Sequence, residues 1–214
     1  MRLYIKKWSC WSPSSEEGSV RGPGLPYVSS LFRRRLSQIS RITIQVIHDV
    51  LPYAQGSPIV FISTNGESSR QMQINRMLVQ DGEILPAPFS LSVFNTPPAV
   101  ASIALNITAG YSAIYPEKNL FEEGFVYGAS IIFSGDADSV ILVFADERLP
   151  SEYAVIADPA ENTQPCGAAF VLSGTGDSGS LEIDIDPENY IPGMLFPSSD
   201  IHEFLSSMQK RMPI

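Results

Sequence analysis

Short apolar strands alternate with helical segments along most of this chain, and this alternation limits the folds that it can adopt. The stretches SPIVFIST (Ser57–Thr64) and SVILVFAD (Ser139–Asp146) are apolar over nearly their whole length, and YSAIY (Tyr111–Tyr115) lies between them. Strands of this kind are buried on both faces, which requires helices on each side of the sheet. The pattern therefore predicts a layered α/β fold.

Five helices are predicted from apolar periodicity and from capping residues. Gly82 ends the second, Asn95 or Thr96 caps the third, and Asp200 with Glu203 caps the last. The clearest is the first, where apolar residues recur at three- and four-residue steps. The predicted helices span residues 30–51, 66–82, 95–110, 119–133 and 201–212.

The far end of the sheet is predicted to be antiparallel. GAAFVLSG (Gly167–Gly174) and SLEIDID (Ser180–Asp186) are strands separated by a short turn, which is typical of a hairpin. We therefore expect a mixed, mostly parallel sheet that ends in an antiparallel hairpin. A length of 214 residues suits one main domain, which we place at residues 1–186, followed by a loop and a C-terminal helix at 187–214.

The charge balance argues against nucleic acid as a partner. The net charge is −9, whereas duplex binding needs positive charge along one face. Residues 1–41 hold eight basic and two acidic side chains, and the remainder holds six basic and 21 acidic ones. This asymmetry is consistent with a small basic patch that attracts an acidic partner, or with a solvated helix face.

Cysteine and histidine are too sparse to suggest a metal site or a disulfide framework. Cys10 and Cys166 lie far apart, and two histidines accompany them. We expect two reduced thiols and no metal or cofactor. The basic N-terminus has no apolar segment behind it, so no secretory signal is predicted, and we expect a cytoplasmic protein.

The interval from Ile84 to Pro116 contains no charged residue, which raises the question of a membrane span. Prolines, asparagines and a glycine divide it into short pieces, so a membrane helix is not predicted. We expect this interval to form a buried centre instead.

Three motifs suggest chemistry but lack the context that the chemistry needs. GTGDSG (Gly174–Gly179) matches a dinucleotide fingerprint, yet a strand follows it instead of a helix, which favours a turn. The overlapping GDSGS resembles a serine protease loop, but His48 and His202 lie on predicted helices. Carboxylates at Glu182, Asp184 and Asp186 share one face of a strand about 7 Å apart, which favours a solvated sheet face.

The stretch GYSAIYPEKNLFEEG (Gly110–Gly124) has the form of a nucleophile turn. An apolar strand runs into a turn marked by Pro116, and a helix follows. This is the geometry on which many α/β enzymes mount a reactive side chain. No Cys or Ser lies in the turn itself, so the reactive atom is absent.

Taken in order, the segments resemble the N-terminal half of the β-ketoacyl synthases of the thiolase superfamily. The similar stretches are LFRRRLSQISRITIQVI, SVFNTPPAVASIALNITAGYSAI and GASIIFSGDADSVILVFADE, which extend over roughly Arg33–Glu147. Three further motifs are similar to those of the ketosynthase-like N-terminal domains from aryl polyene and related biosynthetic gene clusters: FISTNGE, FSLSVFN and VFADERLP. The resemblance implies the thiolase-like N-terminal half fold for residues 1–186, and the β-ketoacyl synthase class of acyltransferases.

The resemblance also implies that this chain has lost the catalytic groups. In a synthase the turn ends at the cysteine that takes the acyl chain, and that position falls on Glu117 or Lys118 here. Neither forms a thioester, and the two catalytic histidines belong to a C-terminal half that is not in this sequence. We therefore interpret Tyr115, Pro116, Glu117 and Lys118 as a degenerate nucleophile turn, a vestige of a catalytic site.

The resemblance further implies a dimer, because in the thiolase fold this strand pairs with its counterpart in a partner. The dimer edge would be Tyr111, Ser112, Ala113, Ile114 and Tyr115. We expect a non-catalytic, chain-length-factor-like partner of a full-length synthase, with Arg33, Arg34 and Arg35 attracting an acyl carrier protein. Two alternatives stay open: a malonyl- or acyl-thioester decarboxylase or hydrolase that uses Glu117, and a homodimeric scaffold or binding protein.

Overall fold

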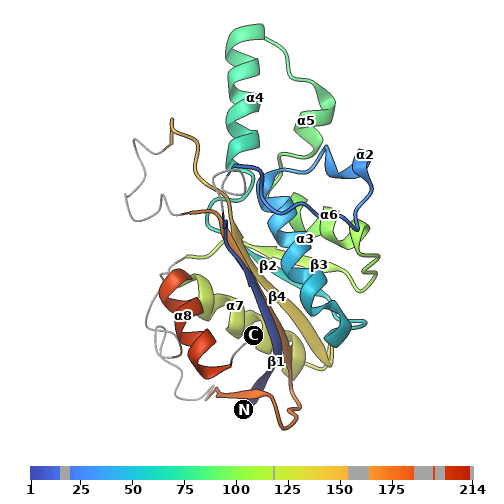
Figure 1. Cartoon of the computed structure of the whole chain (residues 1–214), viewed down its shortest axis with the longest axis vertical. Helices are drawn as coiled ribbons and strands as arrows, with labels where there is room; N and C mark the ends of the chain where they lie inside the picture. Colours follow the sequence, from blue (N-terminus) through green and yellow to red (C-terminus); the bar gives the residue numbers. More distant parts are fainter. Residues whose placement is uncertain (15–19, 118, 154–163, 186–194, 196–200, 213–214) are drawn as a thin grey trace.

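A computed structural model of the chain shows one six-stranded sheet with helices on both faces (Figure 1). It describes residues 1–14, 20–117, 119–153, 164–185, 195 and 201–212. The strands are β1 (Arg2–Trp11), β2 (Ile59–Ile62), β3 (Tyr111–Ile114), β4 (Ser139–Asp146), β5 (Cys166–Ser173) and β6 (Leu181–Asp184). The helices are α2 (Ser30–Arg33), α3 (Gln38–Val50), α4 (Ser68–Asp81), α5 (Pro86–Ser90), α6 (Thr96–Ala104), α7 (Leu120–Phe133) and α8 (Ile201–Arg211), with a 3₁₀ turn at Leu51–Tyr53.

The strand order is β3-β2-β4-β5-β1-β6. β2 runs parallel to both of its neighbours, with Phe61 opposite Ala113 of β3 and Val143 of β4. β5 is antiparallel to β4 and β1, and β6 is antiparallel to β1. Four strands therefore run one way and two the other, and the predicted mixed, mostly parallel sheet is confirmed.

The predicted hairpin of β5 and β6 is wrong in its pairing. The two strands are joined by a short loop, but β1 lies between them, and Tyr4 pairs with both Ser173 and Glu182. The reason is that β1 has ten residues and offers both of its edges to antiparallel neighbours. Neighbouring strands in the sequence gave no sign that an N-terminal strand inserts between them.

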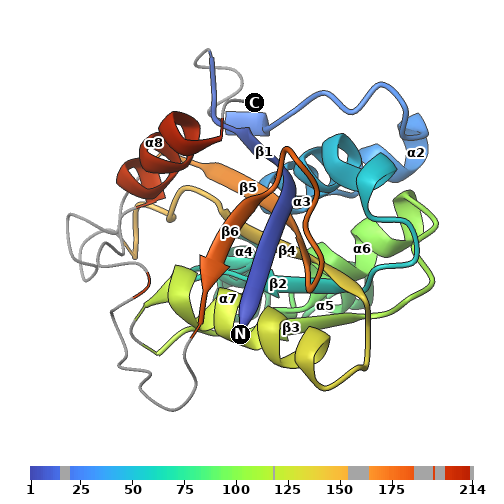
Figure 2. The same ribbon diagram turned by 90° about the horizontal axis from the view of Figure 1, so that it is seen from below.

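The alternation of side chains along the strands divides the core in two. One face packs under α3 and α6, and the other packs under α7 and α8 (Figure 2). Facing α3 and α6 are Ile59, Phe61, Ile141, Val143, Ala169 and Val171. Facing α7 and α8 are Val60, Ile62, Val140, Leu142, Phe144, Phe170 and Leu172.

The helix predicted over residues 30–51 is two helices. α2 ends at Arg33 and α3 begins at Gln38, because Ser29 and Ser37 each cap a separate start. The Ser37 hydroxyl accepts the backbone N–H of Ser40 at 3.2 Å. A serine at the N-cap satisfies a helix N–H that would otherwise lack a partner, so it begins a helix where periodicity alone continues one.

The third helix, predicted over residues 95–110, is too long, because α6 ends at Ala104 and Asn106 takes the left-handed conformation with φ +54°. The ends of two other helices agree with the sequence. Gly82 ends α4 in the left-handed conformation with φ +71°, and Asn119 caps α7 by accepting the N–H of Glu122. The predicted cap at Asp200 and the domain boundary at residue 186 lie outside the described residues. α8 itself packs on the core through Phe204 and Met208, which are 5% and 1% exposed. Within the described part of the chain, no helix has the length and hydropathy to cross a membrane.

Candidate functional site

The structure contains the predicted turn between β3 and α7, and the described residues of this turn include no nucleophile. Tyr115 is exposed, Pro116 is buried and Glu117 is exposed, while Lys118 lies outside the described residues. The Glu123 carboxylate closes the turn by accepting the backbone N–H groups of Glu117 at 2.9 Å and Asn119 at 3.1 Å. A carboxylate in the first turn of a helix is also favoured by the helix dipole. The turn is therefore held in shape by α7 itself.

The thiols and the described imidazole lie elsewhere. Cys10 is on β1 and Cys166 is buried at the start of β5. His48 is on α3, where its ring stacks on Tyr27 at 3.7 Å between centroids. In the parts of the chain that the structure places, the Glu117 carboxylate has no hydrogen-bond or ionic partner. The turn thus presents the exposed carboxylate of Glu117, and no described acid or base side chain is paired with it.

The predicted dimer strand lies at the edge of the sheet. β3 pairs with β2 on one side, and no strand among the described residues pairs with its other side. The N–H of Ile59 donates to the carbonyl of Gly110. Backbone groups of a strand alternate in direction, so the N–H groups of Tyr111 and Ala113 point to the open side. β3 thus presents unpaired backbone groups at the sheet edge.

The expectation that the charge-free interval 84–116 forms a buried centre is wrong. α5, α6 and β3 lie along one side of the molecule (Figure 1), and many of their apolar side chains are exposed. Hydropathy alone does not separate a core segment from an apolar surface, which explains the error. The exposed apolar residues of this interval, which we call the apolar face, are Leu85 (57%), Phe89 (56%), Val93 (45%), Ile103 (69%), Tyr111 (39%) and Tyr115 (69%).

Aromatic contacts join the apolar face to the turn. Phe94 lies edge-on to Tyr115 at 6.1 Å and to Phe61 of the core at 6.0 Å. Gly66 allows this approach, because a Cβ atom there would lie 2.7 Å from the Phe94 ring. The segment before α6, the turn and the end of β2 therefore form one packed unit.

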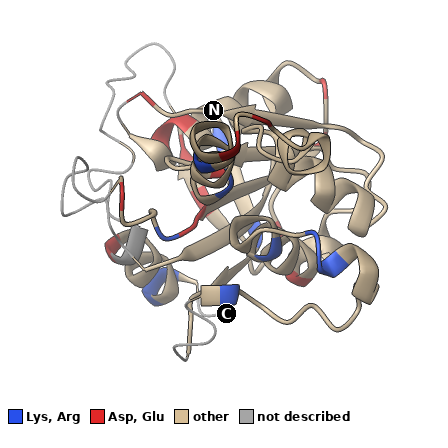
Figure 3. Cartoon of the chain, turned by 90° about the horizontal axis from the view of Figure 1, so that it is seen from above, with Lys and Arg blue, Asp and Glu red and all other residues tan. Residues whose placement is uncertain are grey.

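The predicted arginine cluster is split between two roles. Arg33 donates to the carbonyls of Gly24 at 3.0 Å and Leu25 at 2.9 Å, and so holds the loop before α2. Arg34 and Arg35 follow α2 and are exposed. Figure 3 colours the basic positions blue. Of the three, Arg34 and Arg35 have exposed side chains that could meet a partner.

The glycine-rich motif and the acids of the last strand have the structural roles that the sequence favoured, a turn and a solvated sheet face. Gly174–Gly179 forms the loop between β5 and β6, and a strand follows it, so no helix N-terminus is present for a phosphate. Glu182 and Asp184 are exposed on β6, and Asp186 lies outside the described residues.

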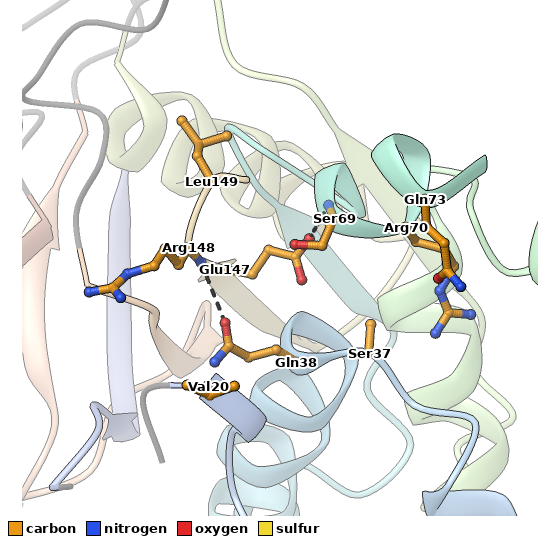
Figure 4. Close-up of a pocket in the computed structure, with 9 residues that line it drawn as sticks. All are labelled: Val20, Ser37, Gln38, Ser69, Arg70, Gln73, Glu147, Arg148 and Leu149. Carbon is orange, nitrogen blue, oxygen red and sulfur yellow. Dashed lines mark hydrogen bonds between the residues drawn. The ribbon is translucent and has the colours of Figure 1, made fainter. Parts of the chain in front are cut away.

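Sequence reasoning missed a cluster of carboxylates at the carboxyl ends of β2 and β4. Asp146 accepts the Ser63 hydroxyl at 2.6 Å and the N–H groups of Thr64 and Asn65. Glu147 accepts the N–H of Ser69 at 2.7 Å (Figure 4). Asp146 ends β4 and Glu147 follows it, whereas Glu67 lies after the loop that follows β2, directly before α4. Acids that follow the carboxyl ends of sheet strands were the signal in the sequence.

The third acid of the cluster, Glu67, lies beside the start of α3. It accepts the hydroxyls of Ser37 at 2.7 Å and Ser40 at 2.9 Å, and it lies 3.5 Å from the Nε atom of Arg70. A cavity of about 350 Å³ opens between these elements, with Glu147, Gln38 and Arg70 in its wall. No group of three acidic, histidine or cysteine side chains in the described part could hold a metal ion.

Burial raises the pKa of all three carboxyl groups, Asp146 included. The pKa of Glu147 rises to about 7, and the nearby carboxylate of Glu67 adds to the rise, while the hydrogen bonds from Ser69 and Ser68 oppose it. Burial also raises the pKa of Glu67, although the hydroxyls of Ser37 and Ser40 and the charge of Arg70 oppose this rise. The cluster is therefore able to hold a proton near neutral pH.

Comparison with known proteins decides the family. The model of the β-ketoacyl synthase N-terminal domain matches residues 8–194. This chain belongs to that family. A search of curated protein sequences found no match. The thiolase-like fold predicted from the resemblance is confirmed by the solved ketosynthase structures that this β-ketoacyl synthase domain resembles.

Among similar structures is one of a ketosynthase (ApeO) in complex with its chain length factor (ApeC) from Xenorhabdus doucetiae. The TM-score is 0.69 and the identity 25%, over 81% of this chain and 79% of that chain. The ishigamide ketosynthase/chain length factor is similar with a TM-score of 0.59, 12% identity and coverage of 81% and 62%. A β-ketoacyl synthase from Burkholderia phymatum gives 0.57, 11%, 80% and 59%. The chain thus spans about three fifths of the length of the last two.

Proposed function

We propose that this chain is a non-catalytic, chain-length-factor-like subunit that pairs with a full-length β-ketoacyl synthase in fatty acid, polyketide or aryl polyene biosynthesis. The observation that supports the proposal is the turn between β3 and α7, whose sequence contains no cysteine or serine, and where the resemblance implies Glu117 or Lys118 at the position of the family's cysteine. A carboxylate does not form the thioester that a cysteine thiolate forms with an acyl chain.

The open edge of β3 supports pairing with another chain. Unpaired N–H and C=O groups at a sheet edge are a template for a further strand. The apolar face includes Tyr111 and Tyr115 at this edge, and exposed apolar side chains gathered on one side of a molecule mark interaction sites. A partner strand along Tyr111–Tyr115 would satisfy the backbone groups and cover Tyr111 and Tyr115 in one step.

The similar complex from Xenorhabdus doucetiae supports the identity of the partner. That structure is named as a ketosynthase with its chain length factor, and the match covers nearly equal shares of both chains. A chain of similar length is thus part of a ketosynthase assembly. The exposed Arg34 and Arg35 fit an acidic acyl carrier protein as a further partner, since opposite charges steer association.

Co-expression with a full-length β-ketoacyl synthase from the same organism tests the pairing. We expect a one-to-one complex by size-exclusion chromatography with light scattering. Ala113→Pro removes an outward N–H of β3 and should abolish the complex, whereas Ala113→Gly keeps that N–H and should retain it. A stable homodimer that ignores the synthase would contradict the proposal and favour the scaffold alternative.

A catalytic role for Glu117 is tested separately. Incubation with malonyl carrier protein should release no carbon dioxide above the level of the Glu117→Ala variant. Release that depends on Glu117 would replace the proposal with the decarboxylase alternative.

A further inference from the structure

The α4–α5 arm, residues 68–90, is held mainly at its root. α4 has 14 residues, of which Ser68 and Ile74 are buried. Apolar side chains on the rest of the arm, including Leu78, Val79 and Phe89, are at least half exposed. Figure 1 shows the arm rising away from the sheet. Further along α4, Arg76 pairs with Glu152 and Asn75 lies 3.4 Å from the Tyr153 hydroxyl, both at the surface. An element with so few buried contacts opens locally at low free energy, so the buried contacts at its root contribute most to holding it in place.

Two buried carboxyl groups make these root contacts. Glu147, directly after β4, accepts the N–H of Ser69 at 2.7 Å and the hydroxyl of Ser68 at 3.3 Å. Glu67, directly before α4, accepts the hydroxyls of Ser37 and Ser40 at the start of α3. Glu147 is 3% exposed and Glu67 is 2% exposed. The first turn of α4 is therefore tied to the sheet and to α3 through acids that are shielded from water.

The charges around Glu147 leave it without a counter-ion. Arg70 of α4 is within 3.5 Å of Glu67 and donates to the carbonyl of Arg35. Asp146 of β4 is bonded to the loop after β2, and α3 contributes uncharged groups to this side of the cavity. Arg148 is exposed, and Figure 4 shows its guanidinium directed away from Glu147. Ionised Glu147 thus adds a negative charge near Glu67, and both residues have very little exposed surface.

We propose that Glu147 is a proton-operated switch at the root of the α4–α5 arm. When it is protonated, the carboxyl group holds α4 against β4 and α3. When it is ionised, the closed root is disfavoured relative to an open form in which the carboxylate is hydrated. The arm carries part of the apolar face, so the effect of the switch on a partner rests on the proposed function, whereas the switch itself does not.

The size of the effect follows from linkage. With a pKa of about 7 in the closed form and the ordinary glutamate pKa of 4.5 in the hydrated open form, the equilibrium for opening rises about tenfold between pH 6 and pH 8. The direction is set by the closed form, which binds more protons than the open form in this range. Opening therefore increases as the pH rises.

Hydrogen exchange on the isolated full-length chain tests the switch without any partner. After correction for intrinsic exchange rates, amides of α4 should exchange about tenfold faster at pH 8 than at pH 6, relative to amides of β4. Glu147→Gln keeps an acceptor for Ser69 and should greatly reduce this pH dependence, with Glu67 left as the remaining buried acid at the root. Glu83→Gln changes an exposed acid in the same arm and should leave the wild-type behaviour intact.

A second variant decides the question if Glu147→Gln does not fold. Glu67→Gln removes the neighbouring negative charge, so the midpoint of the pH-dependent exchange should move to lower pH. Equal pH dependence in wild type and Glu147→Gln, or an unchanged midpoint in Glu67→Gln, would overturn the proposal. Failure of the chain to bind a synthase would leave these results unaffected and would count against the proposed function alone.

Discussion

Phe204 is the aromatic side chain that docks α8 on the core, and removing its ring should weaken the whole domain. Phe204 is 5% exposed and stacks on Phe121 with 4.1 Å between ring centroids. Phe125, Phe144 and Phe170 lie within 6.3 Å of it. Among the α8 side chains whose burial is described, from Glu203 on, Met208 is also buried. Phe204 therefore joins α8 to the core that α7, β4 and β5 share.

The expected loss for Phe204→Ala is about 3 kcal/mol in the free energy of unfolding. Removal of a buried phenylalanine side chain typically destabilises by about 3–5 kcal/mol. The lower end applies here, because α8 lies on the surface and can settle toward the vacated space. Ser206→Ala changes an exposed position on the same helix and should alter stability by less than about 0.5 kcal/mol.

Urea unfolding measures the loss, and Trp8 fluorescence reports the docking of α8. The Trp8 ring stacks on Phe170 at 5.9 Å, and its indole N–H donates to the carbonyl of Met212 at 2.6 Å. In a Trp11→Phe background, Phe204→Ala should therefore shift the native emission to longer wavelength. A loss below about 1 kcal/mol with unchanged emission would show that α8 contributes little to the core, and that the reasoning is wrong.

Three further outcomes are expected. Gly66→Ala should destabilise by about 1–3 kcal/mol in urea unfolding, because the residue has φ +56° and its Cβ would meet the Phe94 ring at 2.7 Å; Gly82→Ala, with open space, should lose less. Glu147→Gln should be about 1–3 kcal/mol more stable than wild type at pH 8 and nearly equal at pH 5, because the raised folded pKa makes the wild-type protein lose stability as the pH rises from 4.5 to about 7. Phe89→Asp should weaken co-purification with the synthase at least tenfold without lowering the melting temperature, since its side chain is 56% exposed and an ionised group there would be buried by the partner.

Local signals in the sequence were sufficient for most of the sheet. The strands at Ile59–Ile62 and Ser139–Asp146 are buried at nearly every position, so continuous apolar runs identified them. Gly82 and Asn119 marked helix ends, because their side chains or conformations serve the helix directly. The split of the first helix was missed, although Ser37 is a strong N-cap residue, because the apolar period continues across it.

The strand order and the contacts between residues far apart in sequence could not be predicted from such local signals. The insertion of β1 between β5 and β6 depends on pairing between the two ends of the chain. The carboxylate cluster joins Glu67 and Glu147, which are far apart in sequence and meet because parallel β2 and β4 end side by side. The exposure of Ile103 and its neighbours was misjudged for a related reason, since a surface that a partner could cover has the hydropathy of a core.

The turn between β3 and α7 has the groups that fix its shape, but its described residues include no nucleophile. Each group that sets its shape is present: Asn119 caps α7, and Glu123 binds the N–H groups of the turn. Gly124 lets α7 approach β2 and β4 closely, because a Cβ there would lie 2.7 Å from Ile62 and 2.9 Å from Phe144. A turn that keeps its scaffold without a described nucleophile still fixes the positions of β3 and α7. Such a turn is useful to a subunit that supplies a rigid edge and a shaped surface to another chain, which is the role that we propose.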